Sequence, residues 1–301
     1  MSRRYDSRTT LFSPEGMLIV DICELLDFSR SYAESILQFF PFLFSFFNTD
    51  SIIFPLIFIG RIFQVEYAIE AINQTGASLG MICKDGILLL ADKKSTSRLF
   101  ETRQEKVYKL ADHISCAVSG LTADANTLID HCRIRAKRYL YTYGEPIPVE
   151  DIARELADVK QSYTQHGGLR PFGASLLIAG WDDKLGVQLY RTAPSGNYGG
   201  GRAAAIGRKS RAATGVLRGS FKEGMTFDEA KKYALSVFAR TLDATSLSSD
   251  KLEMCVVKRE RGEIVVQFVD GDEVQRLAEE AKKERDEKEE DEEESSSSIL
   301  L

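Results

Sequence analysis

Short apolar runs alternate along the chain with longer amphipathic stretches. The short runs come in pairs separated by turn residues and predict strands; Asp85-Gly86 is the clearest turn, because Asp-Gly favours a tight hairpin. The run Leu88-Leu89-Leu90 is typical of a strand covered on both faces. The predicted strands cover residues 77–83, 87–91, 107–110, 114–118, 174–179, 187–191, 203–206, 254–258 and 264–269.

Between these strand groups, apolar residues recur every three or four positions, which predicts amphipathic helices at 61–73, after Thr122, after Pro148, at 210–221 and at 226–242. Thr122 is the expected N-cap of the second helix, which should end at Gly144. Thr226 and Glu229 fit a capping box. The helix after Pro148 has an apolar stripe at Ile152, Leu156, Val159 and Tyr163.

The predicted order is strands, two helices, strands, two helices, strands. Hairpins grouped between helix pairs do not alternate as βαβ units would, so this order predicts two antiparallel sheets packed face to face with helices outside. The expected fold class is therefore α+β, as a four-layer α/β/β/α sandwich. We expect turns at residues 194–197 and at 199–202, the second between two strands.

The overall composition is that of a folded protein, with 301 residues, 44% hydrophobic and 28% charged, and it excludes a disordered, collagen-like or disulfide-scaffold chain. The net charge of −6 is local. Residues 278–294 hold eleven acids and four bases, which leaves 34 acids and 35 bases elsewhere. No Lys/Arg stripe is present, which argues against a nucleic-acid partner.

An apolar excess is equally local, because residues 17–60 hold nine of the 17 Phe. Residues 36–60 are long enough to span the ~30 Å hydrocarbon core of a membrane as one helix. Pro41 and Pro55 would interrupt that helix, and Asp50 would cost about 2.5–3.5 kcal/mol near the bilayer centre. A membrane partner is therefore disfavoured.

Metal, cofactor and catalytic motifs are absent from the residue pattern. The five Cys are far apart and the three His lack ligand spacing, so we expect free thiols in a reducing compartment and no metal or cofactor. No nucleophile elbow, zinc-protease, P-loop or dinucleotide-binding motif occurs. The residues alone point to no active site.

Eight short motifs, taken together, resemble alpha subunits of the 20S proteasome over residues 1–16 and 61–276. The motifs are Tyr5-Asp6, 12–16 (FSPEG), 61–68 (RIFQVEYA), 91–94 (ADKK), Glu105-Lys106, 119–121 (SGL), 163–165 (YTQ) and 170–173 (RPFG). The resemblance implies an N-terminal nucleophile hydrolase-like sandwich of the catalytically inactive alpha type. Catalytic beta subunits expose an N-terminal Thr nucleophile, and Gly76 falls at that position here.

The resemblance also implies site residues and partners. Tyr5, Asp6, Pro14 and Tyr67 match the residues that hold the gate of the alpha ring. Gly76, Lys106, Gly120 and Leu121 match a pocket between neighbouring alpha subunits, in which the lysine receives the C-terminal carboxylate of a docking activator. The implied partners are other alpha subunits in a hetero-heptameric ring, beta-ring subunits and regulatory particles, in cytoplasm and nucleus.

The chain is thus expected to comprise a gate segment (1–16), an apolar insertion (17–60), the sandwich domain (61–276) and an acidic tail (277–301), helical from Glu273 to about Arg285. The insertion's Phe, Leu, Ile and Ser bias is what T-rich DNA encodes, which favours a retained intron. The function implied is a structural, gating subunit in ubiquitin-dependent degradation. Two alternatives remain: a variant tethered to a membrane through 36–60, and a proteolytic beta-type subunit cleaved near Thr75-Gly76.

Overall fold

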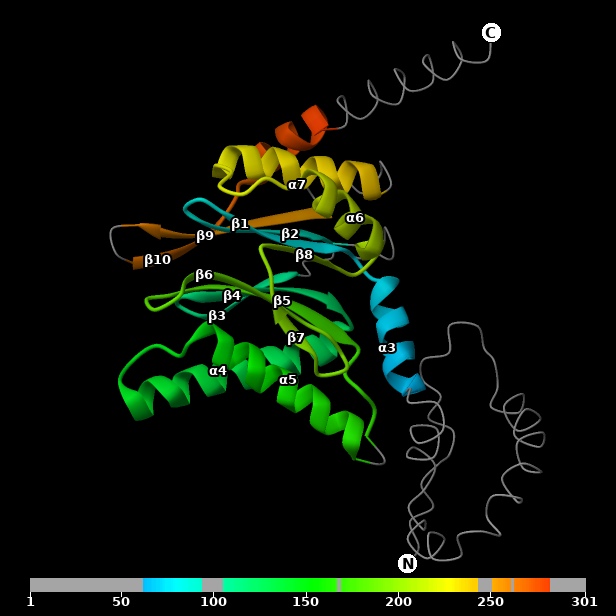
Figure 1. Ribbon diagram of the computed structural model, residues 1–301, viewed down its shortest axis with the longest axis vertical. Helices are drawn as coiled ribbons and strands as arrows, with labels where there is room; N and C mark the ends of the chain where they lie inside the picture. Colours follow the sequence, from blue (N-terminus) through cyan, green and yellow to red (C-terminus); the bar gives the residue numbers. More distant parts are fainter. Residues whose placement is uncertain (1–61, 94–104, 167–168, 243–250, 261–262, 282–301) are drawn as a thin grey trace, which may run out of the picture.

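Two five-stranded antiparallel sheets lie face to face between two layers of helices (Figure 1). The computed structural model describes residues 62–93, 105–166, 169–242, 251–260 and 263–281. Residues of both sheets form a core between the sheets, and each outer sheet face packs its own core against helices. The four-layer sandwich predicted from the order of elements is confirmed.

The first sheet has the strand order β10-β9-β2-β1-β8. Its strands are β1 (Ser78–Cys83), β2 (Gly86–Asp92), β8 (Ala203–Ile206), β9 (Leu252–Glu260) and β10 (Glu263–Phe268). The predicted hairpin at Asp85-Gly86 is present, with Cys83 opposite Gly86. All seven residues of β2 are buried, as its run of three Leu predicts for a central strand covered on both faces.

The second sheet has the order β3-β4-β5-β6-β7. Its strands are β3 (Val107–Ala111), β4 (Ile114–Gly120), β5 (Ala174–Asp182), β6 (Gly186–Thr192) and β7 (Tyr198–Gly200). The expectation of a turn at 199–202 was wrong for its first half, because Gly199 and Gly200 pair with β6. Glycine suits this edge strand, since a Cβ on Gly200 would lie 3.2 Å from the Tyr190 ring.

Helices α4 (Thr122–Tyr143) and α5 (Val149–Gln165) cover the second sheet, while α6 (Ser210–Ser220) and α7 (Phe227–Thr241) cover the first (Figure 1). The capping box at the start of α7 is confirmed. The N-cap of α4 is Leu121 and not Thr122. Helix α4 begins one residue early because the Leu121 N–H donates to the Gly173 carbonyl, 2.8 Å away, and so fixes the chain there.

The apolar stripe expected on α5 packs against the core, with Ile152 and Leu156 fully buried, but the most buried face of the helix extends to other residues. Val159 and Tyr163 are only partly buried. The buried face comprises Val149, Ile152, Ala153, Leu156, Ala157 and Lys160. A lysine thus occupies a position that the helical period assigns to the core.

Helix α3 (Phe63–Asn73) lies across one end of the sandwich, ahead of β1 (Figure 1). At the other end of the chain, residues 271–281 are helical and bury Val274, Ala278 and Ala281 against the α7 layer. The helix therefore begins two residues before Glu273, and residues beyond 281 lie outside the described part. Among the described residues, no helix is both long enough and apolar enough to cross a membrane; residues 36–60 also lie outside that part.

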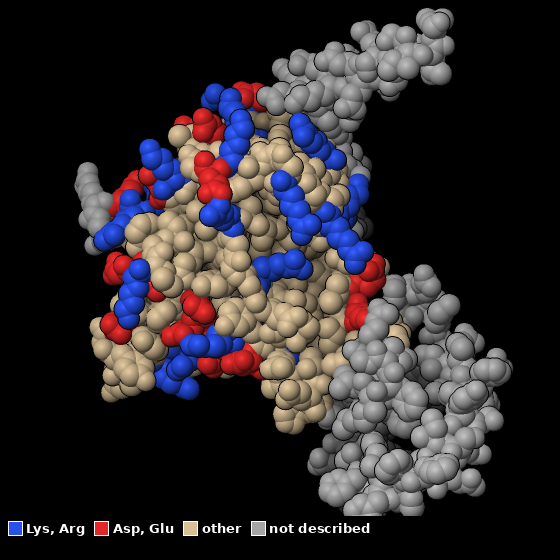
Figure 2. All heavy atoms as spheres, viewed as in Figure 1, with Lys and Arg blue, Asp and Glu red and all other residues tan. Residues whose placement is uncertain are grey.

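Acidic and basic side chains intermingle over most of the face in Figure 2, with basic groups gathered over the α6 and α7 layer. Four cysteines, Cys83, Cys116, Cys132 and Cys255, are buried free thiols, as expected from their spacing. Cys23 lies outside the described residues. No group of three or more His, Cys, Asp or Glu in the described ranges is arranged to hold a metal.

Candidate functional site

The end of the sandwich beside α3 brings together the four residues that the sequence assigned to a pocket. Gly76 lies between α3 and β1, Lys106 precedes β3, Gly120 ends β4, and Leu121 caps α4. We call these four residues the Lys106 group. The gate residues Tyr5, Asp6 and Pro14 lie outside the described residues, and Tyr67 is on α3, half-buried, with its ring 6.5 Å from that of Phe63.

Ser119 joins the two sheets at this end. Its hydroxyl donates to the Gly76 carbonyl at 2.7 Å and lies 2.9 Å from the Thr75 hydroxyl. Gly207 completes the junction, because a Cβ there would lie 2.4 Å from the Gly76 oxygen and its φ of +84° suits glycine. Gly76 is thus buried within a continuous chain, with its carbonyl bonded to Ser119.

Gly120 turns the chain from β4 into α4 with a φ of +128°, and a Cβ there would lie 2.1 Å from the Gly173 carbonyl oxygen. That oxygen accepts the Leu121 N–H. The Leu121 side chain remains 40% exposed and is therefore available to a partner. Close backbone approach at Gly120 and Gly173 fixes this corner of the site.

Lys106 is 9% exposed, so its ammonium is largely removed from water. Burial lowers the pKa of Lys106, and the carboxylates of Asp92 and Glu253 oppose that effect. Asp92 also lies 3.5 Å from Arg208, and Glu253 lies 3.5 Å from Lys93. The site is therefore a partly buried group of lysine, arginine and carboxylate side chains.

None of the eight motifs contains Glu253 or Arg208, and Asp92 occurs only within the 91–94 motif. Glu253 lies on β9, Arg208 follows β8 and Asp92 ends β2. Only the pairing of strands that are far apart in the sequence brings these residues to Lys106. The available signal was weak: an acid at the second position of β9 (LEMCVVKRE), just ahead of four buried apolar residues.

The residues of the 170–173 motif have a structural role: they bond the start of α4, beside the Lys106 group. Arg170 donates to both oxygens of Asp124 at 2.6 and 2.7 Å, and the Gly173 N–H donates to Asp124 at 2.8 Å. Phe172 packs on Tyr163 with ring centroids 4.4 Å apart. Burial alone would raise the pKa of Asp124, but the hydrogen bonds from Arg170 and Gly173 outweigh it and lower the pKa.

Replacing Asp124 by Asn should lower the free energy of unfolding by about 2–4 kcal/mol at neutral pH, because a charged acceptor of three hydrogen bonds is lost. Because the folded state lowers its pKa, wild type should lose this contribution as the pH falls below about 4. Urea unfolding of both full-length chains measures the difference. Asp112→Asn is the matched control, since Asp112 is 87% exposed; equal effects of the two substitutions would contradict this role.

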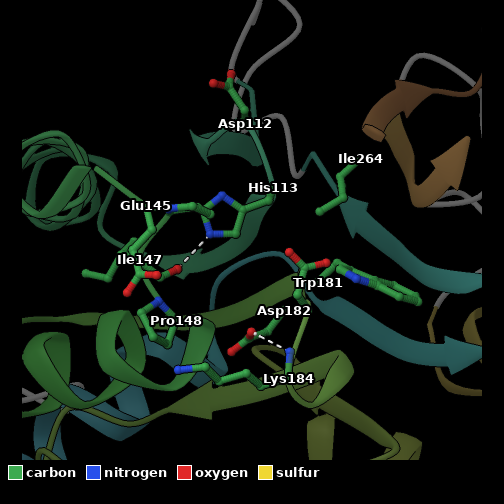
Figure 3. Close-up of a pocket in the computed structure, with 11 residues that line it drawn as sticks. Asp112, His113, Glu145, Ile147, Pro148, Trp181, Asp182, Lys184 and Ile264 are labelled. Carbon is green, nitrogen blue, oxygen red and sulfur yellow. Dashed lines mark hydrogen bonds between the residues drawn. The ribbon is translucent and has the colours of Figure 1, made fainter. Parts of the chain in front are cut away.

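A cavity of about 550 Å³ lies at the opposite end of the sandwich, among the β3–β4 turn, the α4–α5 loop, the β5–β6 turn and Ile264 (Figure 3). Several of its polar groups are already engaged within the chain, although the buried Trp181 Nε1 has no hydrogen-bond partner among the described residues. His113 Nε2 lies 2.7 Å from the Ile147 carbonyl, and Asp182 accepts the Lys184 N–H at 3.0 Å. Asp112 pairs with Lys109 at 2.8 Å. Because these groups are engaged, the cavity is a weaker candidate than the Lys106 group.

A family model described as "Proteasome subunit" matches residues 72–257, which include strands of both sheets and the Lys106 group. The chain belongs to the proteasome subunit family. Within that family it is similar to "Proteasome subunit alpha type-4" of Spinacia oleracea, at 42% identity over 284 residues, which covers 93% of this chain and 96% of the relative.

Two further relatives carry the same subunit type. "Proteasome subunit alpha type-4-A" of Arabidopsis thaliana is 45% identical over 259 residues, covering 85% of this chain and 86% of the relative. "Proteasome subunit alpha type-4-1" of Oryza sativa subsp. japonica is 44% identical over 270 residues, covering 89% and 90%. The resemblance to proteasome alpha subunits that the sequence indicated is confirmed, and these relatives are all of the alpha type-4 kind.

Proposed function

We propose that this chain is a non-catalytic structural and gating subunit of the 20S proteasome core particle, at the third position of the outer alpha ring. In this role it controls substrate entry and docks regulatory particles in ubiquitin-dependent protein degradation. The observation that carries the proposal is the similarity to alpha type-4 subunits over 85–93% of the chain.

The surroundings of Gly76 support a subunit without its own protease site. A beta-type nucleophile is a Thr with a free N-terminal amine. Here the corresponding residue has no hydroxyl, is buried, follows α3 in an unbroken chain, and has its carbonyl bonded to Ser119. None of these features favours the proteolytic alternative.

The Lys106 group supports a docking role for this end of the sandwich. A lysine beside glycines suits capture of a peptide's terminal carboxylate, because the ammonium supplies charge and the glycines let a backbone approach. The partners proposed are neighbouring alpha subunits, the beta ring and the C-termini of activators, in cytoplasm and nucleus. Tyr67, with Tyr5, Asp6 and Pro14, is assigned to the gate.

Replacing Lys106 by Ala in assembled core particles should weaken activator docking at this pocket roughly ten- to hundredfold, because a charge-assisted bond contributes about 1.5–3 kcal/mol. Ring assembly should be retained. The measurement is activator-stimulated hydrolysis of a fluorogenic peptide as a function of activator concentration, with native gels to confirm assembly.

Lys109→Ala is the matched control, because Lys109 lies three residues further along and its side chain is 53% exposed beside Asp112. It should leave both stimulation and assembly unchanged. If peptide hydrolysis by the Lys106→Ala particle is stimulated at the same activator concentration as in wild type, the assignment of this pocket is wrong.

A further inference from the structure

Glu253 joins three segments of the chain at the Lys106 group. From the second position of β9, its carboxylate accepts the Lys106 N–H at 2.7 Å and the Val107 N–H at 3.3 Å. The same oxygen lies 3.5 Å from the Lys93 ammonium, just after β2. Because β9 and β3 belong to different sheets, a single side chain fixes the start of β3 across the sandwich.

The start of β3 depends on these hydrogen bonds to Glu253. Among the described residues, β3 is an edge strand that pairs only with β4, whose Val118 N–H donates to the Lys106 carbonyl at 2.9 Å. That bond holds Lys106 on one side, and Glu253 holds its amide on the other. The Glu253 side chain is only 10% exposed, so water competes poorly for these hydrogen bonds.

Glu253 also acts on the charge of Lys106. Burial favours the neutral amine, whereas the carboxylates of Glu253 and Asp92 favour the ammonium. The charges of these two acids act on Lys106, and each acid also lies 3.5 Å from a further cation, Glu253 from Lys93 and Asp92 from Arg208. Glu105, the residue before Lys106, is exposed. The carboxylate of a partner would bring a further anion to these cations.

We propose that Glu253 is the positioning residue of Lys106, holding its main chain in place and keeping its ammonium charged for the terminal carboxylate of a docking partner. The inference rests on the proposed function for the identity of the partner. The effect of Glu253 on Lys106 can be measured without any partner, which separates the two claims.

The first experiment follows Lys106 itself in assembled particles. Competitive acylation across pH, read by mass spectrometry of the peptide containing Lys106, reports the pH at which the amine loses its proton. Glu253→Gln, which keeps an acceptor oxygen but removes the charge, should move this midpoint to lower pH and raise Lys106 labelling several-fold at neutral pH. An unchanged midpoint would overturn the inference, whatever happens to docking.

The second experiment is a double-mutant cycle in activator-stimulated peptide hydrolysis. Glu253→Ala should weaken docking about tenfold in wild type and have no further effect when Lys106 is already Ala. Full additivity would contradict a role exerted through Lys106. Glu260→Gln, at the exposed far end of the same strand, is the control and should leave both measurements unchanged. If Lys106→Ala alone leaves docking intact, the proposed pocket fails, and the acylation result still decides the role of Glu253.

Discussion

Replacing Gly120 by Ala should destabilise the protein by about 3 kcal/mol or more. A φ of +128° is unfavourable for any residue with a Cβ, and the added carbon would lie 2.1 Å from the Gly173 oxygen and 2.8 Å from the Ala174 Cα. Both neighbours are backbone atoms of a paired strand, so they cannot move aside as a side chain would. Relief of the clash must separate β4 from β5 at the corner that carries the Lys106 group.

Urea and thermal unfolding of the full-length chain test this expectation, and the melting temperature should fall by roughly 6–12 °C. Gly215→Ala is a matched control on α6, because nothing lies within 4 Å of its Cβ position. The control should stabilise the chain by about 0.5–1 kcal/mol through helix propensity alone. Equal stability of the Gly120→Ala chain and wild type would show that the corner tolerates a side chain.

Local signals predicted the elements of this fold well, because their causes lie within a few residues. Asp85-Gly86 marked a hairpin, Gly144 ended α4 in a left-handed conformation, and Thr226 with Glu229 capped α7. The grouping of hairpins between helix pairs then predicted the layers. The start of α4 was missed by one residue because a bond to Gly173, more than fifty positions away, determines it.

The candidate site was only partly predictable, because some of its contacts also join residues that are far apart in the sequence. The resemblance supplied Gly76, Lys106, Gly120 and Leu121, which the topology then brought to one end of the sandwich. The resemblance did not supply Glu253, whose partners lie 146 and 147 residues away in the chain. A contact between two sheets leaves no local periodicity in the sequence.

Lys160, like Glu253, was not predicted from the apolar pattern of the sequence. It lies on the buried face of α5 and is fully buried, and its ammonium donates to the Thr192 hydroxyl at 2.9 Å. The turn between β6 and β7, distant in sequence, packs closely on the same helix. A Cβ on Gly196 in that turn would lie 2.6 Å from Gln161. Burial lowers the pKa of Lys160 to about 7.

This lowered pKa makes stability depend on pH in a defined direction. Between about pH 7 and the ordinary lysine value of 10.5, the unfolded chain holds a proton at residue 160 that the folded chain lacks. The free energy of unfolding therefore rises with pH in this window, by about 1.4 kcal/mol per pH unit from Lys160, and this contribution is lost as the pH falls toward 7. The full penalty of burying the ammonium is about 5 kcal/mol.

Replacing Lys160 by Met should therefore stabilise the chain at pH 7 by a few kcal/mol, because an apolar side chain of similar length occupies the same space without a charge. The advantage over wild type should shrink by about 2 kcal/mol between pH 7 and about pH 8.5. Urea unfolding of both full-length chains across this range measures it. Burial raises the pKa of the nearby thiols Cys116 and Cys132, and loss of the Lys160 charge would raise it further, so both thiols stay protonated in either folded chain over this range.

Lys184→Met, at an exposed position in the β5–β6 turn, controls for the loss of a lysine as such and should show no pH-dependent difference from wild type. A Lys160→Met chain that is less stable than wild type at pH 7 would mean that the ammonium is stabilised in the core by more than Thr192. If its advantage at pH 7 instead stays constant up to about pH 8.5, Lys160 does not change protonation within that window. The expected result, an advantage that falls with rising pH, identifies the buried amine as the source of the dependence, because the substitution removes that titrating group and keeps the rest of the helix face.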